Sequence, residues 1–304
     1  MKKSLKYLLA LLPAAALCAC SSSSESKSAP IITSFYPIYN FTLAVTEGTP
    51  LGAANLAKTQ AGCLHDYQLT SGNMRSISGA ETFIINGAGM EDGFINKAIG
   101  QNPRITLIDS AENVALSETS SHNHGGEGHD EEHGGEYNSH VWTSVENAKK
   151  QTETIASELS AKYPQYSEIF IENADSYCKT LSQIDVPDFS GLDINVVSFH
   201  EAFAYLLNDV GINVTETVEI DENTVPSAKR LAHIADSAEN ENISAVICAD
   251  DGGLAFVETV SRELGVPCIV LDPVTSGPDD KNGYIDAQIK NFETLKEAFL
   301  IEKP

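Results

Sequence analysis

The sequence predicts an α/β protein made of two lobes that are joined by a long helix. Short runs of β-branched and aliphatic residues alternate with longer stretches of helical spacing, which is the pattern of parallel β-α-β units. A stretch of helical spacing at 164–186 separates two such series. We therefore expect an N-terminal lobe at 30–163 and a C-terminal lobe at 187–304, and 304 residues are enough for both.

Strands are expected where the apolar runs are short and rich in Val, Ile and Phe. These runs are 31–35, 82–85, 105–108, 194–199, 245–248 and 268–271. Thr143 and Glu146 are spaced as a capping box for a helix that runs to about residue 163, where Pro164 interrupts it. The linking helix follows and ends before Pro187.

The first 19 residues have the features of a bacterial export signal. Lysines near the start precede an apolar stretch at 8–17, which is too short to span a bilayer because about 20 residues are needed. Leu17-Cys18-Ala19-Cys20 resembles a lipobox, which implies cleavage after residue 19 and acylation of the Cys20 thiol. An ordinary signal peptide with a chance cysteine is the alternative. Residues 20–29 are then a flexible tether that holds the protein outside the cytoplasm, at a membrane face.

The formal net charge of −24 argues against a nucleic-acid partner and against adsorption to anionic lipid. It is compatible with the attraction of cations. The cysteines after Cys20 show no Cys-x-x-Cys spacing, so a thiolate metal site is not expected; they are Cys63, Cys178, Cys248 and Cys268. We expect buried thiols. Because Cys248 and Cys268 both fall in predicted strands, a disulfide between them is left open.

Seven of the eight histidines, all but His233, fall into two groups. One group is clustered in a Gly- and acid-rich loop at 121–138 and consists of His122, His124, His129 and His133. The other group is isolated, each member at the edge of an apolar segment: His65, His140 and His200. A cluster of imidazoles in a loop without a core predicts a secondary, low-affinity metal-gathering segment, and dispersed histidines can form a defined site after folding. Together they predict the capture of a transition metal, with zinc favoured.

Parallel sheets bind ligands beyond the carboxyl ends of their strands, where the following loops converge. His200, Asp250 and Asp272 each follow a predicted strand of the C-terminal lobe. This lobe is therefore expected to supply one imidazole and carboxylates, with His65 and His140 coming from the N-terminal lobe.

Four blocks of the sequence resemble the zinc/manganese solute-binding lipoproteins of bacterial ABC transporters (cluster A-I), in the order of that family. They are GCLHDYQLT at 62–70, INGAGME at 85–91, HVW at 140–142 and SFHEAF at 198–203. The resemblance runs from about residue 31 to the end and favours the zinc-specific branch. It implies two Rossmann-like lobes, a single long rigid linking helix and one metal in the interlobe cleft. The ligands implied are His65, His140, His200 and Asp272.

The chain departs from the family after the His-Val-Trp block, where Thr143-Ser144-Val145 stands in place of the frequent Leu-Asp-Pro. This departure leaves His140 in place and alters what surrounds it. The fourth ligand is the least secure, because Asp250 or a water can take the place of Asp272. Three imidazoles favour Zn²⁺ over Mn²⁺, which prefers oxygen donors.

Three other functions are kept as alternatives. A manganese-binding counterpart of the same family is the first, and a metal-buffering cell-adhesion protein without a transporter, in which the loop binds the metal, is the second. The third is a zinc hydrolase, which three histidines and a water would allow and a carboxylate ligand would oppose. The peptidase-like pattern His-x-x-Glu-His at 129–133 is flanked by glycines that disfavour the helix it needs.

The sequence thus predicts a lipid-anchored, extracytoplasmic, non-enzymatic protein that binds Zn²⁺ and delivers it to an ABC permease and its ATPase. No nucleic-acid partner is expected.

Overall fold

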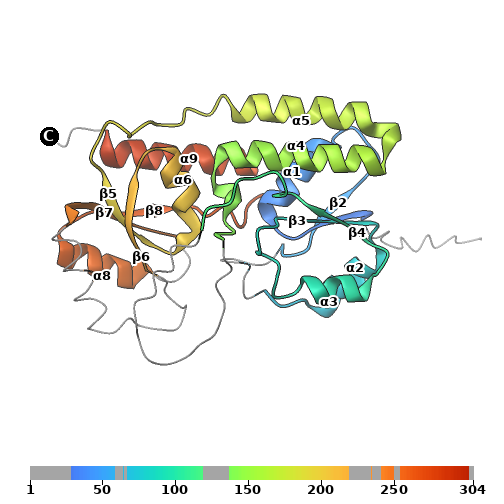
Figure 1. Cartoon of the computed structure of the whole chain (residues 1–304), viewed down its shortest axis with the longest axis horizontal. Coiled ribbons are helices and arrows are strands. Elements are labelled where there is room, and N and C mark those ends of the chain that lie inside the picture. The colour runs from blue at the N-terminus through green and yellow to red at the C-terminus, as the bar shows by residue number, and fades with distance from the viewer. Residues whose placement is uncertain are drawn as a thin grey trace, which may run out of the picture.

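The computed structural model describes residues 29–58, 64, 67–118, 137–218, 234, 241–249 and 254–300. Within these residues the chain forms two four-stranded parallel sheets, one in each lobe (Figure 1). The predicted fold class is confirmed. The predicted signal peptide, Cys20, and the tether up to residue 28 lie outside the described residues.

The first sheet has the order β2-β1-β3-β4 and is parallel throughout. Its strands are β1 (Ile31–Thr33), β2 (Ala53–Asn55), β3 (Thr82–Ile85) and β4 (Thr106–Asp109). The helices of this lobe are α1 (Tyr36–Thr46), α2 (Ser71–Gly79) and α3 (Ile95–Gln101). The two inner strands are buried along their whole length, as expected for a parallel sheet that helices cover on both faces.

The second sheet has the order β6-β5-β7-β8 and is also parallel. Its strands are β5 (Asn195–Phe199), β6 (Asn213–Val218), β7 (Ile243–Ala249) and β8 (Cys268–Leu271). The helices of this lobe are α6 (Ala204–Asp209), α8 (Leu254–Leu264) and α9 (Gly283–Phe299). His200 and Asp272 directly follow β5 and β8, so they lie at the carboxyl edge of this sheet, where the loops of a parallel sheet converge.

Two helices lie between the two sheets along the chain. α4 (Val145–Lys162) and α5 (Ser167–Leu181) pack against each other, with a 3₁₀ turn at Pro164–Tyr166 between them (Figure 1). The predicted linking helix therefore corresponds to α5, and the segment 182–194 continues to β5. None of the helices in the described part of the chain is long and apolar enough to cross a membrane.

The predicted capping box of α4 is wrong. The N-cap is Ser144, whose hydroxyl accepts a hydrogen bond from the Asn147 N–H at 3.2 Å. Thr143 lies inside a preceding 3₁₀ turn, and its hydroxyl is placed within hydrogen-bonding distance of the His140 and Ala202 carbonyl oxygens, at 2.9 and 3.0 Å. The residue predicted to cap a helix thus joins the two lobes instead.

Candidate metal centre

His140 is held in an orientation suited to metal binding. The residue is 1% exposed and directly precedes the 3₁₀ turn η1 (Val141–Thr143). Its backbone N–H donates to Asn138 Oδ1 at 2.8 Å, and its ring Nδ1 lies 3.0 Å from the same oxygen. Since an amide oxygen only accepts, the ring proton belongs on Nδ1. A metal would then bind through Nε2, and a hydrogen bond from the other ring nitrogen is how metal-binding histidines are usually supported.

His200 follows β5 directly and has a backbone φ of 92°, a value that L-residues rarely adopt. The bend is held by a hydrogen bond from the His200 N–H to Val218 O at 3.0 Å, on the neighbouring strand β6. The ring Nδ1 accepts from the Ala202 N–H at 3.2 Å and so caps the 3₁₀ turn η3 (Glu201–Phe203). Backbone strain of this kind persists where the surrounding structure enforces it, and it is concentrated at functional sites.

The two rings face each other across the junction of the lobes. Their centroids are 4.9 Å apart and their planes are nearly perpendicular, at 87°. His140 comes from the segment before α4, and His200 from the end of a strand in the second sheet. Folding therefore brings together two of the isolated histidines that the sequence singled out.

Asp272 follows β8 and is exposed. Its Oδ1 accepts from the Val274 N–H at 2.7 Å, and its own N–H donates to Asn291 Oδ1 at 2.8 Å. The next residue, Pro273, accepts at its carbonyl from Trp142 Nε1 at 2.8 Å, which attaches this loop to the segment that carries His140. Asp272 thus belongs to the same junction.

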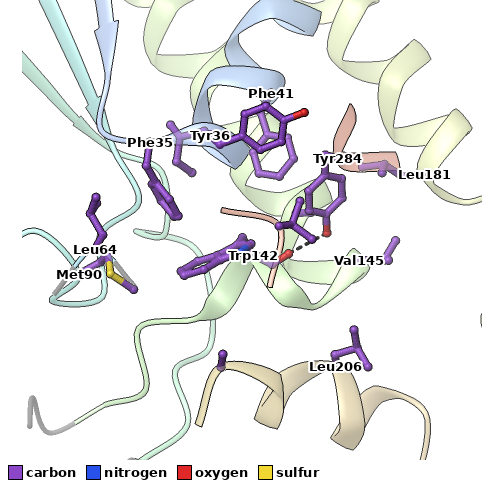
Figure 2. Close-up of a cluster of buried hydrophobic side chains, with 14 of the residues drawn as sticks. Phe35, Tyr36, Phe41, Leu64, Met90, Trp142, Val145, Leu181, Leu206 and Tyr284 are labelled. Carbon is purple, nitrogen blue, oxygen red and sulfur yellow. Dashed lines mark hydrogen bonds between the residues drawn. The ribbon is translucent and has the colours of Figure 1, made fainter. Parts of the chain in front are cut away.

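No group of three His, Cys, Asp or Glu side chains that could hold a metal ion occurs among the residues that the structure describes. His65 and Asp250 lie outside the described residues, and so do the loop histidines His122, His124, His129 and His133. The assignment of His65 and Asp272 as ligands therefore remains a prediction. Leu64, the residue before His65, is 1% exposed and lies in the same buried cluster as Phe35 and Trp142 (Figure 2).

A tyrosine of the second lobe fastens the two ends of the histidine-rich loop. Tyr205, on α6, accepts from the Ser117 N–H at 3.0 Å and donates to Asn138 O at 2.9 Å. The Asn138 amide also donates to Glu201 O at 3.0 Å, so this residue contacts both lobes. Neither Tyr205 nor Asn138 was among the residues predicted from the sequence. The sequence signal that could have pointed to Asn138 is its position two residues before His140, a candidate ligand.

A buried acidic side chain, Glu91, stabilises the backbone that leads to His140. Glu91 is 2% exposed and accepts from the N–H groups of Asn86 at 2.8 Å and Gly87 at 3.1 Å. Burial raises the pKa of Glu91 to about 7. The Asn86 amide in turn donates to Ser139 O at 2.9 Å, next to His140. The sequence block 85–91 therefore acts on the site through the backbone before His140.

Aromatic side chains pack around the residues that follow His140. Trp142 is 1% exposed and meets Phe35 edge-on, with ring centroids 4.7 Å apart (Figure 2). Tyr284, on α9, donates to the Trp142 carbonyl oxygen at 2.7 Å, and Gln288 donates to Thr143 O at 2.8 Å. The segment that carries His140 is thus held by α9 through direct hydrogen bonds, and this packing resists wide separation of the lobes.

Two parallel α/β lobes with a histidine of each facing the other at their junction define a two-lobed solute-binding protein. The model of the family described as the periplasmic component A of zinc-uptake complexes (ZnuA) matches residues 31–298, and the chain belongs to this family.

Relatives with assigned names agree. The chain is 31% identical to the zinc-binding lipoprotein AdcA of Streptococcus pneumoniae strain R6 over 323 residues, covering 99% of the chain and 62% of that relative. It is 25% identical to the high-affinity zinc uptake system protein ZnuA of Bacillus subtilis strain 168, with 93% and 94% covered. The chain thus spans less than two thirds of the length of the streptococcal protein.

Solved structures show the same fold. Zn(II)-bound AdcA from Streptococcus pneumoniae superimposes with a TM-score of 0.70 at 28% identity, covering 90% of this chain and 58% of that one. The solute-binding protein FpvC of Pseudomonas aeruginosa, in complex with Mn²⁺, gives a TM-score of 0.76 at 23% identity, with 89% and 97% covered. At that identity the second match speaks for the fold alone.

Proposed function

We propose that this chain captures Zn²⁺ between its lobes outside the cytoplasm and delivers it to an ABC permease, which its ATPase drives. The observation that carries the proposal is the pair of facing imidazoles, His140 and His200, one from each lobe. His65 and a carboxylate, Asp272, complete the proposed site. Leu64, the residue before His65, is buried in the same hydrophobic cluster as Trp142.

Zinc is the ligand that this donor set favours. Neutral imidazoles with one oxygen donor suit four-coordinate Zn²⁺, and Mn²⁺ prefers more oxygen ligands. The names of the relatives point the same way, since both are zinc proteins. The manganese-binding and adhesion alternatives are not favoured. A carboxylate in the fourth position closes the site to substrate water, so we propose a binding protein and not an enzyme.

The rest of the chain serves the same purpose in this proposal. Residues 1–19 are a signal peptide, Cys20 carries the lipid anchor and 20–29 form the tether to the membrane. A relative that is named a lipoprotein supports this part. The lobes are 30–163 and 187–304, joined by the helix in 164–186.

The histidine-rich loop is proposed as a low-affinity collector that raises the local concentration of zinc. Because Asn138 orients His140, a variant that tests the loop must keep Tyr137 and Asn138. Residues 121–136 are therefore replaced by a short Gly-Ser linker. If uptake under zinc starvation is unchanged by this replacement, the collector role is wrong.

The test of the main site is a competitive zinc titration of this loop variant against a chromophoric chelator. We expect one tight equivalent, lost on His200→Ala and retained on His233→Ala, a histidine outside the proposed set. If the loop variant has no tight equivalent, the loop itself is the binder, and the protein is a metal buffer or an adhesin.

A further inference from the structure

Two cysteines of the C-terminal lobe lie next to each other on neighbouring strands. Cys248 is near the end of β7 and Cys268 begins β8, and their sulfur atoms are 3.8 Å apart. The strand register pairs Cys248 with Val270 and Cys268 with Val246. The cysteines are therefore diagonal neighbours, two positions apart in register, and both side chains point to the same face of the sheet.

The apolar surroundings of the two cysteines favour an uncharged disulfide over a pair of metal-binding thiolates. Cys248 is 2% exposed within an apolar cluster that includes Phe199 and Val257, and Cys268 packs at its edge, where it is partly exposed. Burial raises the pKa of the Cys268 thiol, and the hydrogen bond with Cys248 works in the opposite direction. A metal would require two thiolates in this apolar place, which is costly, whereas a disulfide carries no charge.

We propose that Cys248 and Cys268 are a disulfide site that closes and opens by exchange with an external disulfide. The supply of such a disulfide rests on the extracytoplasmic location in the proposed function, since disulfides form in oxidising compartments. The diagonal register sets the link apart from a structural disulfide. Bridging diagonal neighbours requires the strands to shift, and strained links are the more easily reduced ones.

Partial exposure makes Cys268 the residue that reacts first. Its thiolate attacks one sulfur of the external disulfide, which forms a mixed disulfide and releases one thiol. The Cys248 thiolate then attacks the Cys268 sulfur and releases the second thiol. The two protein thiols lose two electrons and two protons in total, and the external disulfide gains them.

The link would join two strands that lead to the proposed metal site. Cys248 is paired in register with Phe199, the residue before His200. Cys268 begins the strand that ends at Leu271, directly before Asp272. Oxidation therefore acts on the part of the sheet that positions both proposed ligands of the C-terminal lobe.

The test is a map of the cysteines in the folded mature chain after exposure to oxidised glutathione. Alkylation and peptide mass spectrometry then read each cysteine separately. We expect a linked Cys248–Cys268 peptide, complete loss of both thiols together, and recovery of both with dithiothreitol. Cys178 is an internal control: its thiol donates to Lys149 O at 3.7 Å, and burial raises its pKa to about 12, so it stays unreactive.

Single variants check the order of the reaction. Cys248→Ser should leave Cys268 as a stable mixed disulfide with glutathione, and Cys268→Ser should leave the buried Cys248 unmodified. The proposal is overturned if both cysteines of the wild-type protein stay open to alkylation after oxidation, or if either links to another cysteine. The wild-type map decides this even where a variant fails to fold. A parallel zinc titration keeps the result separate from the proposed function, because the cysteine map does not depend on zinc binding.

Discussion

Replacing Asn138 with alanine tests whether His140 is oriented for the metal in advance. The substitution removes the oxygen that accepts from both the His140 backbone and its ring Nδ1. In a ring that is 1% exposed, an unpaired N–H costs about 1–3 kcal/mol. Part of that cost falls on the stability of the metal-free protein. The remainder appears in binding, because a bound metal polarises the imidazole and strengthens the hydrogen bond at Nδ1.

We expect the Zn²⁺ affinity of Asn138→Ala to fall roughly 10- to 100-fold, which corresponds to about 1.4–2.7 kcal/mol. The assay is the chelator competition in the background that lacks the histidine-rich loop. ¹⁵N spectra of the imidazoles should show that the ring of His140, fixed as the Nδ1–H form in the parent protein, becomes a mixture of tautomers.

Two controls separate this effect from general damage. Asn138→Asp keeps an acceptor for His140 and loses the donor to Glu201 O, so its affinity should stay within a few-fold of the parent. Asn113→Ala removes an exposed amide that donates to Thr154 Oγ1, and it should change nothing. The reasoning is refuted if Asn138→Ala folds normally and binds zinc within about twofold of the parent, since an orientation worth at least 1.4 kcal/mol would then be absent.

Three further outcomes are expected. Tyr205→Phe keeps the ring and removes the hydroxyl that bridges Ser117 and Asn138. The free energy of unfolding in denaturant should therefore fall by about 0.5–1.5 kcal/mol, and an unchanged midpoint would show that this bridge does not stabilise the fold. The raised pKa of Glu91, about 7 against 4.5, means that the folded protein holds a proton that the unfolded chain releases. Its contribution to stability therefore decreases as pH rises from about 4.5 to 7, by on the order of 3 kcal/mol, and Glu91→Gln should flatten this slope in pH-dependent melting. Trp142 is the single tryptophan, and its ring centroid lies 5.2 Å from that of His140, so its fluorescence should change on zinc addition and not in His200→Ala.

The inner strands of both sheets could be predicted from the sequence, and two of the four edge strands could not. β3 and β8 match their predicted bounds, because each is a short, continuous apolar run. β2 and β6 were missed, and each lies at the edge of its sheet. β2 has only three partly exposed residues, and β6 reads Asn-Val-Thr-Glu-Thr-Val, with polar side chains between the apolar ones. An edge strand is paired on one side only, so its sequence needs no continuous apolar run.

The sequence singled out His140 and His200, which the structure brings together, but it could not predict the orientation of either ring. The support of His140 was visible in principle, since Asn138 is two residues away in the sequence. The support of His200 was not, because its Nδ1 reaches the Ala202 N–H only through the bend at φ 92°, and that bend depends on pairing with β6.

This difference makes the two histidines unequal as proposed ligands. In His140 the ring proton is on Nδ1, so a metal would bind through Nε2. In His200 the lone pair of Nδ1 is in use, so a metal at Nε2 requires the proton to move to Nδ1 and the cap of η3 to open. In the proposed site, His140 therefore already has the tautomer that metal binding needs, whereas His200 would exchange a backbone hydrogen bond for the metal. In the proposed function, that exchange would subtract about the value of one hydrogen bond from the zinc affinity, and it would favour release of the ion to a permease.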